Sequence, residues 1–305
     1  MNYQSGAVSP VGSIQEGWNI IKNDYWTYVL MCLVFGVILI ITSLILGAIN
    51  GVITNVIAAA FGAATTNSGD VAKASAAILP QVIGQIVSFF TNIALVTLSG
   101  VLLCGFYESL SRLSNGGGRA DFGDLFSGFD HLQACFIYAV VISVVQFIIA
   151  IVTLVIAAAI GVGAIGMGLG SLITKNGQID PAIFGGLFLV ILAFVGVSIV
   201  LNLIISALTA FVYPLIAERN LSGGEALMTS IKSGLSNLGG LILLLIIMFF
   251  MIVGGVFVCF VGVLFVSPII VSSLFAAYQS VFGRTGGYQN YNPPPPPNFS
   301  NQPGY

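Results

Sequence analysis

The ionisable residues of this chain are few, and they are the first candidates for chemistry. Its 305 residues include 10 acidic side chains, 8 basic side chains and 1 histidine. This histidine, His131, directly follows Asp130. A further candidate is the carboxylate of Glu108, which lies at the end of an apolar run. A hydrolytic triad needs a nucleophile, a base and a third group that orients the base. The sequence contains neither HExxH nor GxSxG. We therefore interpret Asp130 and His131 as a solvated polar face, and expect no enzymatic activity and no cofactor.

A second candidate is the pentapeptide Leu-Ser-Gly-Gly-Glu at residues 221–225, which differs by one residue from LSGGQ of ATP-binding cassettes. A cassette also needs the phosphate loop G-x-x-x-x-G-K-[ST], and the chain contains no Gly-Lys-Ser or Gly-Lys-Thr. Ser222 and Glu225 instead have the spacing of a capping box, which satisfies the free N–H groups at a helix start. We predict a helix cap here and no nucleotide binding. The net charge of −2 gives no reason to expect nucleic acid either.

The composition shows which elements must position these residues. Hydrophobic residues make up 57% of the chain and charged residues 6%, and the mean hydropathy is +1.07. A soluble domain carries about 25% charged residues, whereas a bilayer-spanning helix needs about 20 apolar residues. The uncharged runs predict an all-α, polytopic membrane bundle, with the lipid bilayer as its main partner. Its six transmembrane helices lie near residues 25–49, 81–106, 134–158, 184–216, 238–265 and 268–282.

The distribution of Lys and Arg predicts the orientation of these helices. Cytoplasmic loops carry an excess of basic residues. Six spans with both termini in the cytoplasm place six basic residues inside and two, Lys73 and Lys175, outside. Those inside are Lys22, Arg112, Arg119, Arg219, Lys232 and Arg284.

Three acidic patterns precede the odd-numbered spans. Each consists of a cap residue and an acidic residue three positions later, followed by an apolar stripe at helical spacing. The pairs are Ser13 and Glu16, Asp121 and Asp124, and Ser222 and Glu225. We predict three hairpin repeats, each preceded by a cytoplasmic amphipathic helix in the membrane interface.

Two pairs of opposite charges lie near the cytoplasmic ends of spans two and four. Glu108 and Arg112 are four residues apart, and Glu218 is next to Arg219. We predict interfacial ion pairs at both places.

Within the spans, the polar residues of interest are Asn92, Gln146 and Asn202. Each amide either bonds to a neighbouring helix or lines a path for a polar substrate. The four cysteines lie in apolar runs without ligand spacing, so we expect core packing and no metal site.

Outside the spans, three segments differ in character. Residues 1–12 form a flexible N-terminus before the membrane domain of residues 13–284, and residues 50–80 are expected to form short outer helices, one stopped by Pro80. Residues 285–305 form a Pro-rich cytoplasmic tail that is expected to be disordered. Its five consecutive prolines either remain solvated or dock on an aromatic groove of a protein partner.

The stretch YPLIAERNLSGGEALMTS and the later VSPIIVSSLFAAYQ carry a resemblance to a family. They are similar to a broad bacterial group of six-span membrane proteins of unknown function, related to the membrane domain of some glycerophosphodiester phosphodiesterases. The hydrolase barrel of those relatives is missing, so the resemblance implies a bacterial inner-membrane location but no hydrolysis. We expect a non-catalytic scaffold or accessory factor in membrane organisation. The alternative is a carrier or channel for an uncharged or lipid-like small molecule.

Overall fold

The computed structural model describes residues 3–64, 70–168, 181–258 and 261–283, and every regular element in these ranges is helical. This confirms the all-α prediction. The helices are α1 (Pro10–Ile21), α2 (Tyr25–Ala64), α3 (Asp70–Ser114), α4 (Asp124–Ser127), the 3-10 helix η1 (Gly128–His131), α5 (Leu132–Gly168), α6 (Pro181–Thr209), α7 (Val212–Arg219), α8 (Gly223–Ser236), α9 (Leu238–Phe257) and α10 (Val261–Phe282).

Six helical segments among the described residues are long and apolar enough to cross a membrane. Their backbone groups are bonded within each helix, which is the requirement for a segment in lipid. The chain is therefore a helical, multi-pass membrane protein. The segments are Tyr25–Ala60, Val82–Ser114, Asp124–Thr153, Phe194–Arg219, Leu238–Phe257 and Val261–Phe282.

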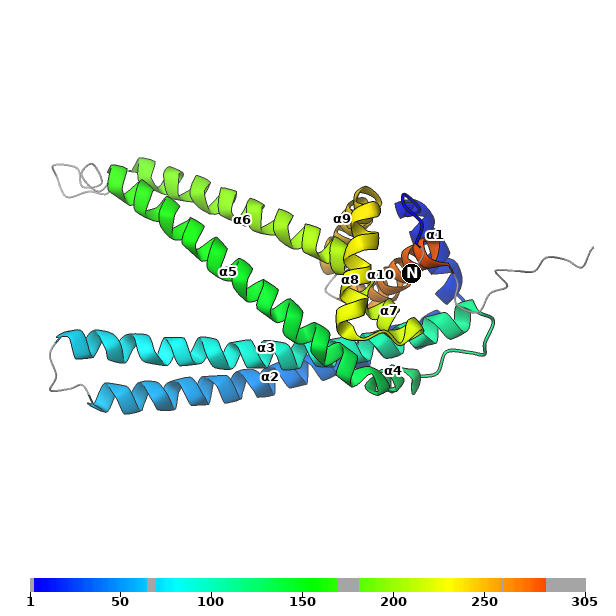
Figure 1. Cartoon of the computed structure of the whole chain (residues 1–305), viewed down its shortest axis with the longest axis horizontal. Helices are drawn as coiled ribbons and strands as arrows, with labels where there is room; N and C mark the ends of the chain where they lie inside the picture. The colour runs from blue at the N-terminus through cyan, green and yellow to red at the C-terminus, as the bar shows by residue number, and fades with distance from the viewer. Residues whose placement is uncertain (1–2, 65–69, 169–180, 259–260, 284–305) are drawn as a thin grey trace, which may run out of the picture.

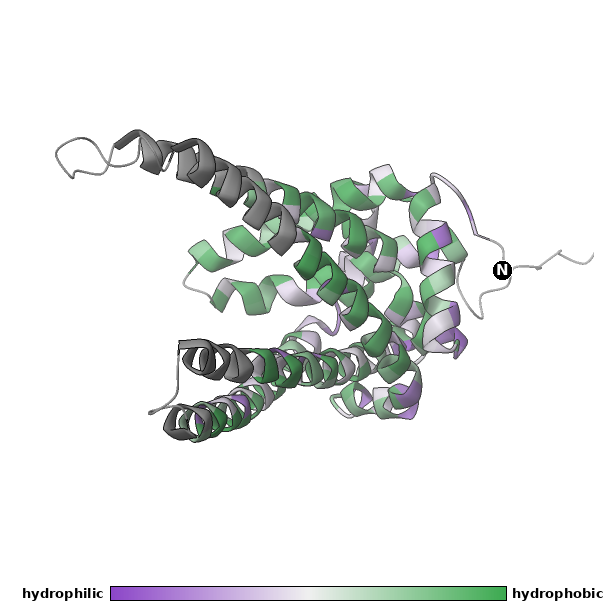
Figure 2. Cartoon of the chain, turned by 60° about the vertical axis from the view of Figure 1, so that its left-hand side comes forward, coloured by the Kyte–Doolittle hydropathy of each residue, from purple (hydrophilic) through white to green (hydrophobic). Residues whose placement is uncertain are grey.

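The long helices pair as three hairpins, α2–α3, α5–α6 and α9–α10, which meet at one end of the molecule (Figure 1). The hairpins α2–α3 and α5–α6 diverge from that end, and the short helices α1, α4, α7 and α8 cluster around it (Figure 1). Figure 2 shows apolar residues along the arms of the hairpins and hydrophilic residues gathered near the shared end. We call this shared end the packed end.

The buried core lies at the packed end. Tyr28, Phe275 and Tyr278 are completely buried there, and the rings of Phe275 and Tyr278 stack with centroids 6.0 Å apart. On the arms, by contrast, large apolar side chains are open: Leu44 of α2 is 67% exposed and Phe90 of α3 is 64% exposed. So large an exposed apolar surface is unfavourable in water, but it is suited to contact with the hydrocarbon core of a bilayer.

Each short element before a hairpin packs on helices of another hairpin. α1 lies along α10, α4 and η1 lie on α3, and α8 lies on α5, α6 and α7. Glycines allow these close approaches: a Cβ added to Gly17 would lie 2.6 Å from a backbone nitrogen of α10. A Cβ on Gly128 would clash with the carbonyl oxygen of Val101, and one on Gly223 with that of Ala134.

The predicted boundary between the last two spans is wrong. The break was expected between residues 265 and 268, but α9 ends at Phe257, α10 begins at Val261, and Pro268 lies inside α10. The backbones of Gly255 and Gly262 touch across the turn, since a Cβ on Gly262 would lie 2.5 Å from the Gly255 carbonyl oxygen. The glycines therefore make the turn, and the proline is accommodated within a membrane helix.

The prediction of short outer helices in residues 50–80 is also wrong. α2 continues to Ala64, and α3 starts at Asp70 and runs through Pro80. With 40 residues at 1.5 Å per residue, α2 is about 60 Å long, twice the bilayer core of about 30 Å. The first hairpin is thus long enough to project well beyond a membrane. Residues 1–2, Lys175, Arg284 and the Pro-rich tail of residues 285–305 lie outside the described residues.

Candidate functional site

At the packed end, polar side chains join α3 and α10, the second helices of the first and third hairpins, and the short helix α7. Ser111 of α3 donates a hydrogen bond to Glu218 Oε1 of α7 at 2.5 Å. Gln279 Nε2 of α10 donates to Ser114 Oγ of α3 at 2.8 Å. Helix α3 is therefore bound to both α7 and α10 by side-chain hydrogen bonds.

Arg219 completes this junction from α7. Its Nε donates to the hydroxyl of Tyr278 at 3.2 Å and its Nη2 to the carbonyl oxygen of Phe282 at 2.8 Å. The guanidinium carbon also lies 5.4 Å from the centre of the Phe282 ring, a cation–π distance. Contrary to the prediction, Glu218 and Arg219 form no ion pair with each other among the described contacts. Both side chains instead bond to the hydroxyl of Tyr278 of α10, and Glu218 also contacts α3.

A second polar cluster joins α3 to the segment of α4 and η1. Arg112 forms an ion pair with Asp124, and His131 Nε2 lies 2.6 Å from Glu108 Oε1. Asp124 also accepts hydrogen bonds from Ser109 Oγ and from the backbone N–H of residue 121, both at 3.0 Å. Glu108 and Arg112 therefore do not pair with each other, contrary to the prediction, because Arg112 has its partner in α4 and Glu108 has its partner in η1.

The geometry around Glu108 bears on the enzyme hypothesis. Ser127 Oγ donates to Glu108 Oε2, while His131 contacts the other oxygen of the same carboxylate. In a hydrolytic triad the imidazole lies between the hydroxyl and the carboxylate; here the carboxylate lies between the other two groups. The contacts of Ser127 Oγ and His131 Nε2 are both to Glu108, so His131 does not accept the hydroxyl proton of Ser127 in this arrangement. The side chain of His131 is only 10% exposed, so its interpretation as a solvated residue beside Asp130 is wrong.

The three predicted helix caps differ in the structure. Ser222 and Glu225 form a complete capping box at the start of α8, with the serine oxygen accepting from Glu225 N–H at 3.4 Å. At the second position the predicted cap is wrong, because α4 begins at Asp124 with Gly123 as its N-cap residue. The carboxylate of Asp124 nevertheless accepts a hydrogen bond from the backbone N–H of Asp121.

The predicted cap at Ser13 is wrong. Helix α1 starts at Pro10 with Ser9 as its N-cap residue, so Ser13 and Glu16 lie within the helix. Proline is favoured in the first turn, because its missing N–H would have no partner there. This places the helix start one turn earlier than the spacing of Ser13 and Glu16 indicates.

The polar residues within the arms do not converge on one site. Asn92 Oδ1 accepts from Ser143 Oγ at 3.2 Å and so joins α3 to α5. Asn202 Nδ2 donates to Ser198 O of its own helix at 2.9 Å. Gln146 and Asn202 are both exposed on the surface of the arms.

The thiols and the other potential metal ligands of the described part form no metal site. Cys32, Cys104 and Cys135 are buried and free, and the sulfur atoms of Cys104 and Cys135 lie 3.5 Å apart. Within the described residues, no group of three or more His, Cys, Asp and Glu side chains could hold a metal ion.

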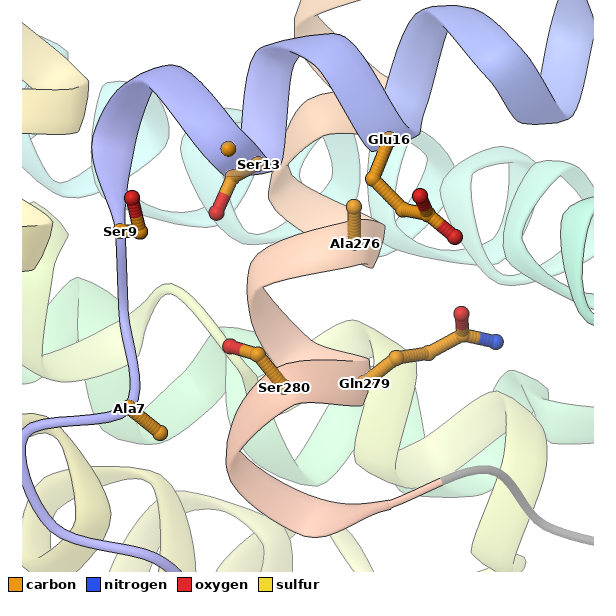
Figure 3. Close-up of a pocket in the computed structure, with 8 residues that line it drawn as sticks. Ala7, Ser9, Ser13, Glu16, Ala276, Gln279 and Ser280 are labelled. Atoms are coloured by element: carbon orange, nitrogen blue, oxygen red, sulfur yellow. The ribbon is translucent and has the colours of Figure 1, made fainter.

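Two cavities whose linings include polar residues open at the packed end. One, of about 270 Å³, lies between α1 and α10 and is lined by the polar residues Ser9, Ser13, Glu16, Gln279 and Ser280 (Figure 3). We call it the α1–α10 cavity. The other, of about 330 Å³, is lined by the polar residues Asp130, His131, Gln133, Asn220 and Ser222. Gln279 was not among the predicted polar residues, although, like Asn92, it is an amide side chain within an apolar run.

Comparison with known proteins returns no protein-family model, no curated protein and no solved structure that matches this chain. The class of the protein therefore follows from its own architecture. It is an all-helical membrane protein with six candidate spans, joined at one end by polar and aromatic contacts.

Proposed function

We propose that the protein is a non-catalytic scaffold or accessory factor in membrane organisation. The supporting observation is the solid packing of the junction between α3, α7 and α10. Tyr107, Phe275 and Tyr278 are at most 2% exposed there, and the rings of Tyr107 and Phe275 stack at 6.0 Å. Large rings fill the place where the hairpins meet, and the amides of Gln146 and Asn202 are exposed on the surface of the arms.

We also propose that the three hairpins are structural repeats. α1, the α4–η1 segment and α8 precede the first, second and third hairpins, respectively. α1 packs on the third hairpin, α4 and η1 on the first, and α8 on the second together with α7. Such cyclic packing is expected when three equivalent units close on one another. We further propose a bacterial inner-membrane location with the packed end and both termini on the cytoplasmic side, and this orientation rests on the distribution of Lys and Arg.

The scaffold proposal is tested by a flux measurement in proteoliposomes. The full chain is reconstituted in sealed vesicles. The release of enclosed glycerol and sucrose, and the movement of a fluorescent phospholipid between the two leaflets, are compared with those in protein-free vesicles. A scaffold leaves each rate unchanged. A rate that rises in proportion to the amount of protein for any of these solutes would refute the scaffold proposal and support the carrier or channel.

The alternative of a carrier for a lipid-like molecule has one supporting observation. A groove of about 320 Å³ opens on the side of the first hairpin, lined by Leu39, Ile40 and Ser43 of α2 and by Leu95, Val96 and Ser99 of α3. The fluorescent phospholipid in the flux assay addresses this alternative directly.

The Pro-rich tail is the candidate contact for a protein partner. Chains with and without residues 285–305 are purified from the same membranes, and the proteins recovered with them are compared. A docking role predicts at least one protein that is lost on truncation. Identical sets would remove the tail from the proposal.

A further inference from the structure

Two cysteine thiols from different hairpins meet at the packed end. Cys104 lies on α3 of the first hairpin and Cys135 on α5 of the second, and their sulfur atoms are 3.5 Å apart. Both side chains are completely buried. The thiol of Cys104 also lies 3.8 Å from the carbonyl oxygen of Tyr213, a weak hydrogen bond. A single buried thiol acts as a small apolar side chain, whereas two thiols in contact can also form a covalent bond.

Close backbone contacts hold the two helices on either side of this pair. Next to Cys104, a Cβ added to Gly105 would overlap a backbone oxygen of α4, so α4 lies directly on the backbone of α3. A Cβ added to Gly223 of α8 would likewise overlap the backbone of α5 one residue before Cys135. The positions of the two cysteines are therefore set by packing that does not depend on their own thiols.

The distance between the sulfurs is short enough for a disulfide to form without a large rearrangement. The sulfur atoms of a disulfide lie about 2.05 Å apart, so the sulfurs of Cys104 and Cys135 must approach by about 1.5 Å. Rotations about the two Cα–Cβ bonds can supply such an approach. The bond would join α3 to α5 at the place from which the first two hairpins diverge.

We propose that Cys104 and Cys135 form a redox-sensitive dithiol, which a small uncharged hydroperoxide converts into a disulfide between the first and second hairpins. Burial of both thiols excludes a bulky, charged oxidant such as oxidised glutathione. On the cytoplasmic side, where we place the packed end, thiols are kept reduced, so a disulfide there is typically transient and redox-sensing. The inference goes beyond the proposed function and holds for a scaffold and for a carrier.

The reaction consumes one hydroperoxide for each pair of thiols. One sulfur attacks an oxygen of the hydroperoxide and breaks the O–O bond, which gives a sulfenic acid, and an alcohol or water leaves with the thiol proton. The second sulfur then attacks the sulfenic sulfur, and the hydroxyl group leaves with the second thiol proton as water. The two sulfurs lose two electrons, and the two peroxide oxygens gain them.

The proposal is tested on the full chain in proteoliposomes treated with hydrogen peroxide or cumene hydroperoxide. The protein is then denatured, and its free thiols are alkylated and counted by intact mass. The chain contains four cysteines, and we expect the number of labels to fall by two and to be restored by dithiothreitol. Trypsin cleaves after the exposed Arg119, between α3 and α4, so the disulfide should hold the two pieces together on a non-reducing gel.

Cysteine variants assign the bond to this pair. Cys104→Ser and Cys135→Ser each remove one sulfur at nearly constant size, so neither variant should give linked pieces. Cys32→Ser is the matched control, because it removes a buried thiol of α2 outside the pair, and the linkage should persist. If the serine variants do not fold, the linked peptide of the wild type, sequenced by mass spectrometry, identifies the two cysteines.

Three results would overturn the proposal. They are an unchanged number of labels in the treated wild type, oxidation of single sulfurs without a linkage, and linked pieces that persist in Cys104→Ser. Oxidised glutathione should link the folded protein at least about tenfold more slowly than the hydroperoxides, and an equal rate would contradict the selection by burial. Faster linkage by cumene hydroperoxide supports an oxidant from the bilayer, and faster linkage by hydrogen peroxide supports one from water.

Discussion

Replacing Gly128 with alanine tests whether the contact between η1 and α3 holds the packed end together. Gly128 has helical dihedral angles, φ −59° and ψ −14°, so alanine causes no backbone strain by itself. In an open helical position this change would stabilise the protein by about 0.5–1 kcal/mol. The sign here should be opposite, because the new Cβ would overlap the carbonyl oxygen of Val101 and lie 2.6 Å from the nitrogen of Gly105.

The magnitude follows from what must move. Both neighbours are backbone atoms of α3, so η1 has to shift away from that helix. Overpacking of this kind costs about 1–3 kcal/mol. The shift also weakens the contacts of Arg112 with Asp124 and of His131 with Glu108. Since these pairs are partly exposed, we add only about 1 kcal/mol for them. The expected loss is about 3 kcal/mol in the free energy of unfolding.

The assay is unfolding of the purified protein in detergent, followed by the fluorescence of Trp18 and Trp26 near the packed end. A loss of about 3 kcal/mol corresponds to a decrease of about 6 °C or more in the melting temperature. Gly47→Ala is the matched control, because Gly47 lies within α2 and a Cβ there would contact nothing. It should leave stability unchanged or raise it slightly. If Gly128→Ala melts at the temperature of the Gly47→Ala protein, the inferred packing of η1 on α3 is incorrect.

Three further predictions concern the cap, the polar cluster and the orientation. Replacing both Ser222 and Glu225 with alanine should lower the free energy of unfolding by about 1–2 kcal/mol, as expected for a lost capping box. Titration with a fluorescent ATP analogue should show no saturable binding to the wild type or to the double variant. Binding to the wild type that vanishes in the variant would restore the nucleotide hypothesis. Asp124→Ala should destabilise more than Arg112→Ala, because Asp124 accepts three hydrogen bonds, and a double-mutant cycle should give a coupling of about 1 kcal/mol or less; equal losses in the two single variants would contradict this. A cysteine introduced at Ser236, which is exposed on α8, should react with a membrane-impermeant maleimide only from the cytoplasmic side, and labelling of intact cells would reverse the orientation.

Local patterns predicted the structure best where the interacting residues are neighbours in the chain. The cap of α8 is such a case, because Ser222 and Glu225 are three residues apart and need only a helix between them. The same spacing failed at Ser13, where Pro10 starts the helix earlier. A capping pattern is therefore informative only where no stronger start signal precedes it.

The ion pairs show why the candidate sites were harder to predict. Glu108 and Arg112 have suitable spacing for a pair within one helix, but such a pair contributes only about 0.2–0.5 kcal/mol. The partners they have instead, His131 and Asp124, are 23 and 12 residues away and are brought close by the contacts of η1 and α4 with α3. Spacing in the sequence does not encode that contact, although Gly105 and Gly128 make it sterically possible.

The sequence by itself determined that this protein is helical and that six segments are suited to a bilayer, because the length and apolarity of a span are properties of the segment alone. It also determined the cap of α8 for the same local reason. Only the tertiary structure decided which short helix packs on which hairpin, which carboxylate pairs with which base, and that the buried Oε1 of Gln279 has no hydrogen-bond partner among the described residues. These features depend on contacts between residues far apart in the chain, and their energies are set by burial and close approach rather than by the identity of neighbouring residues.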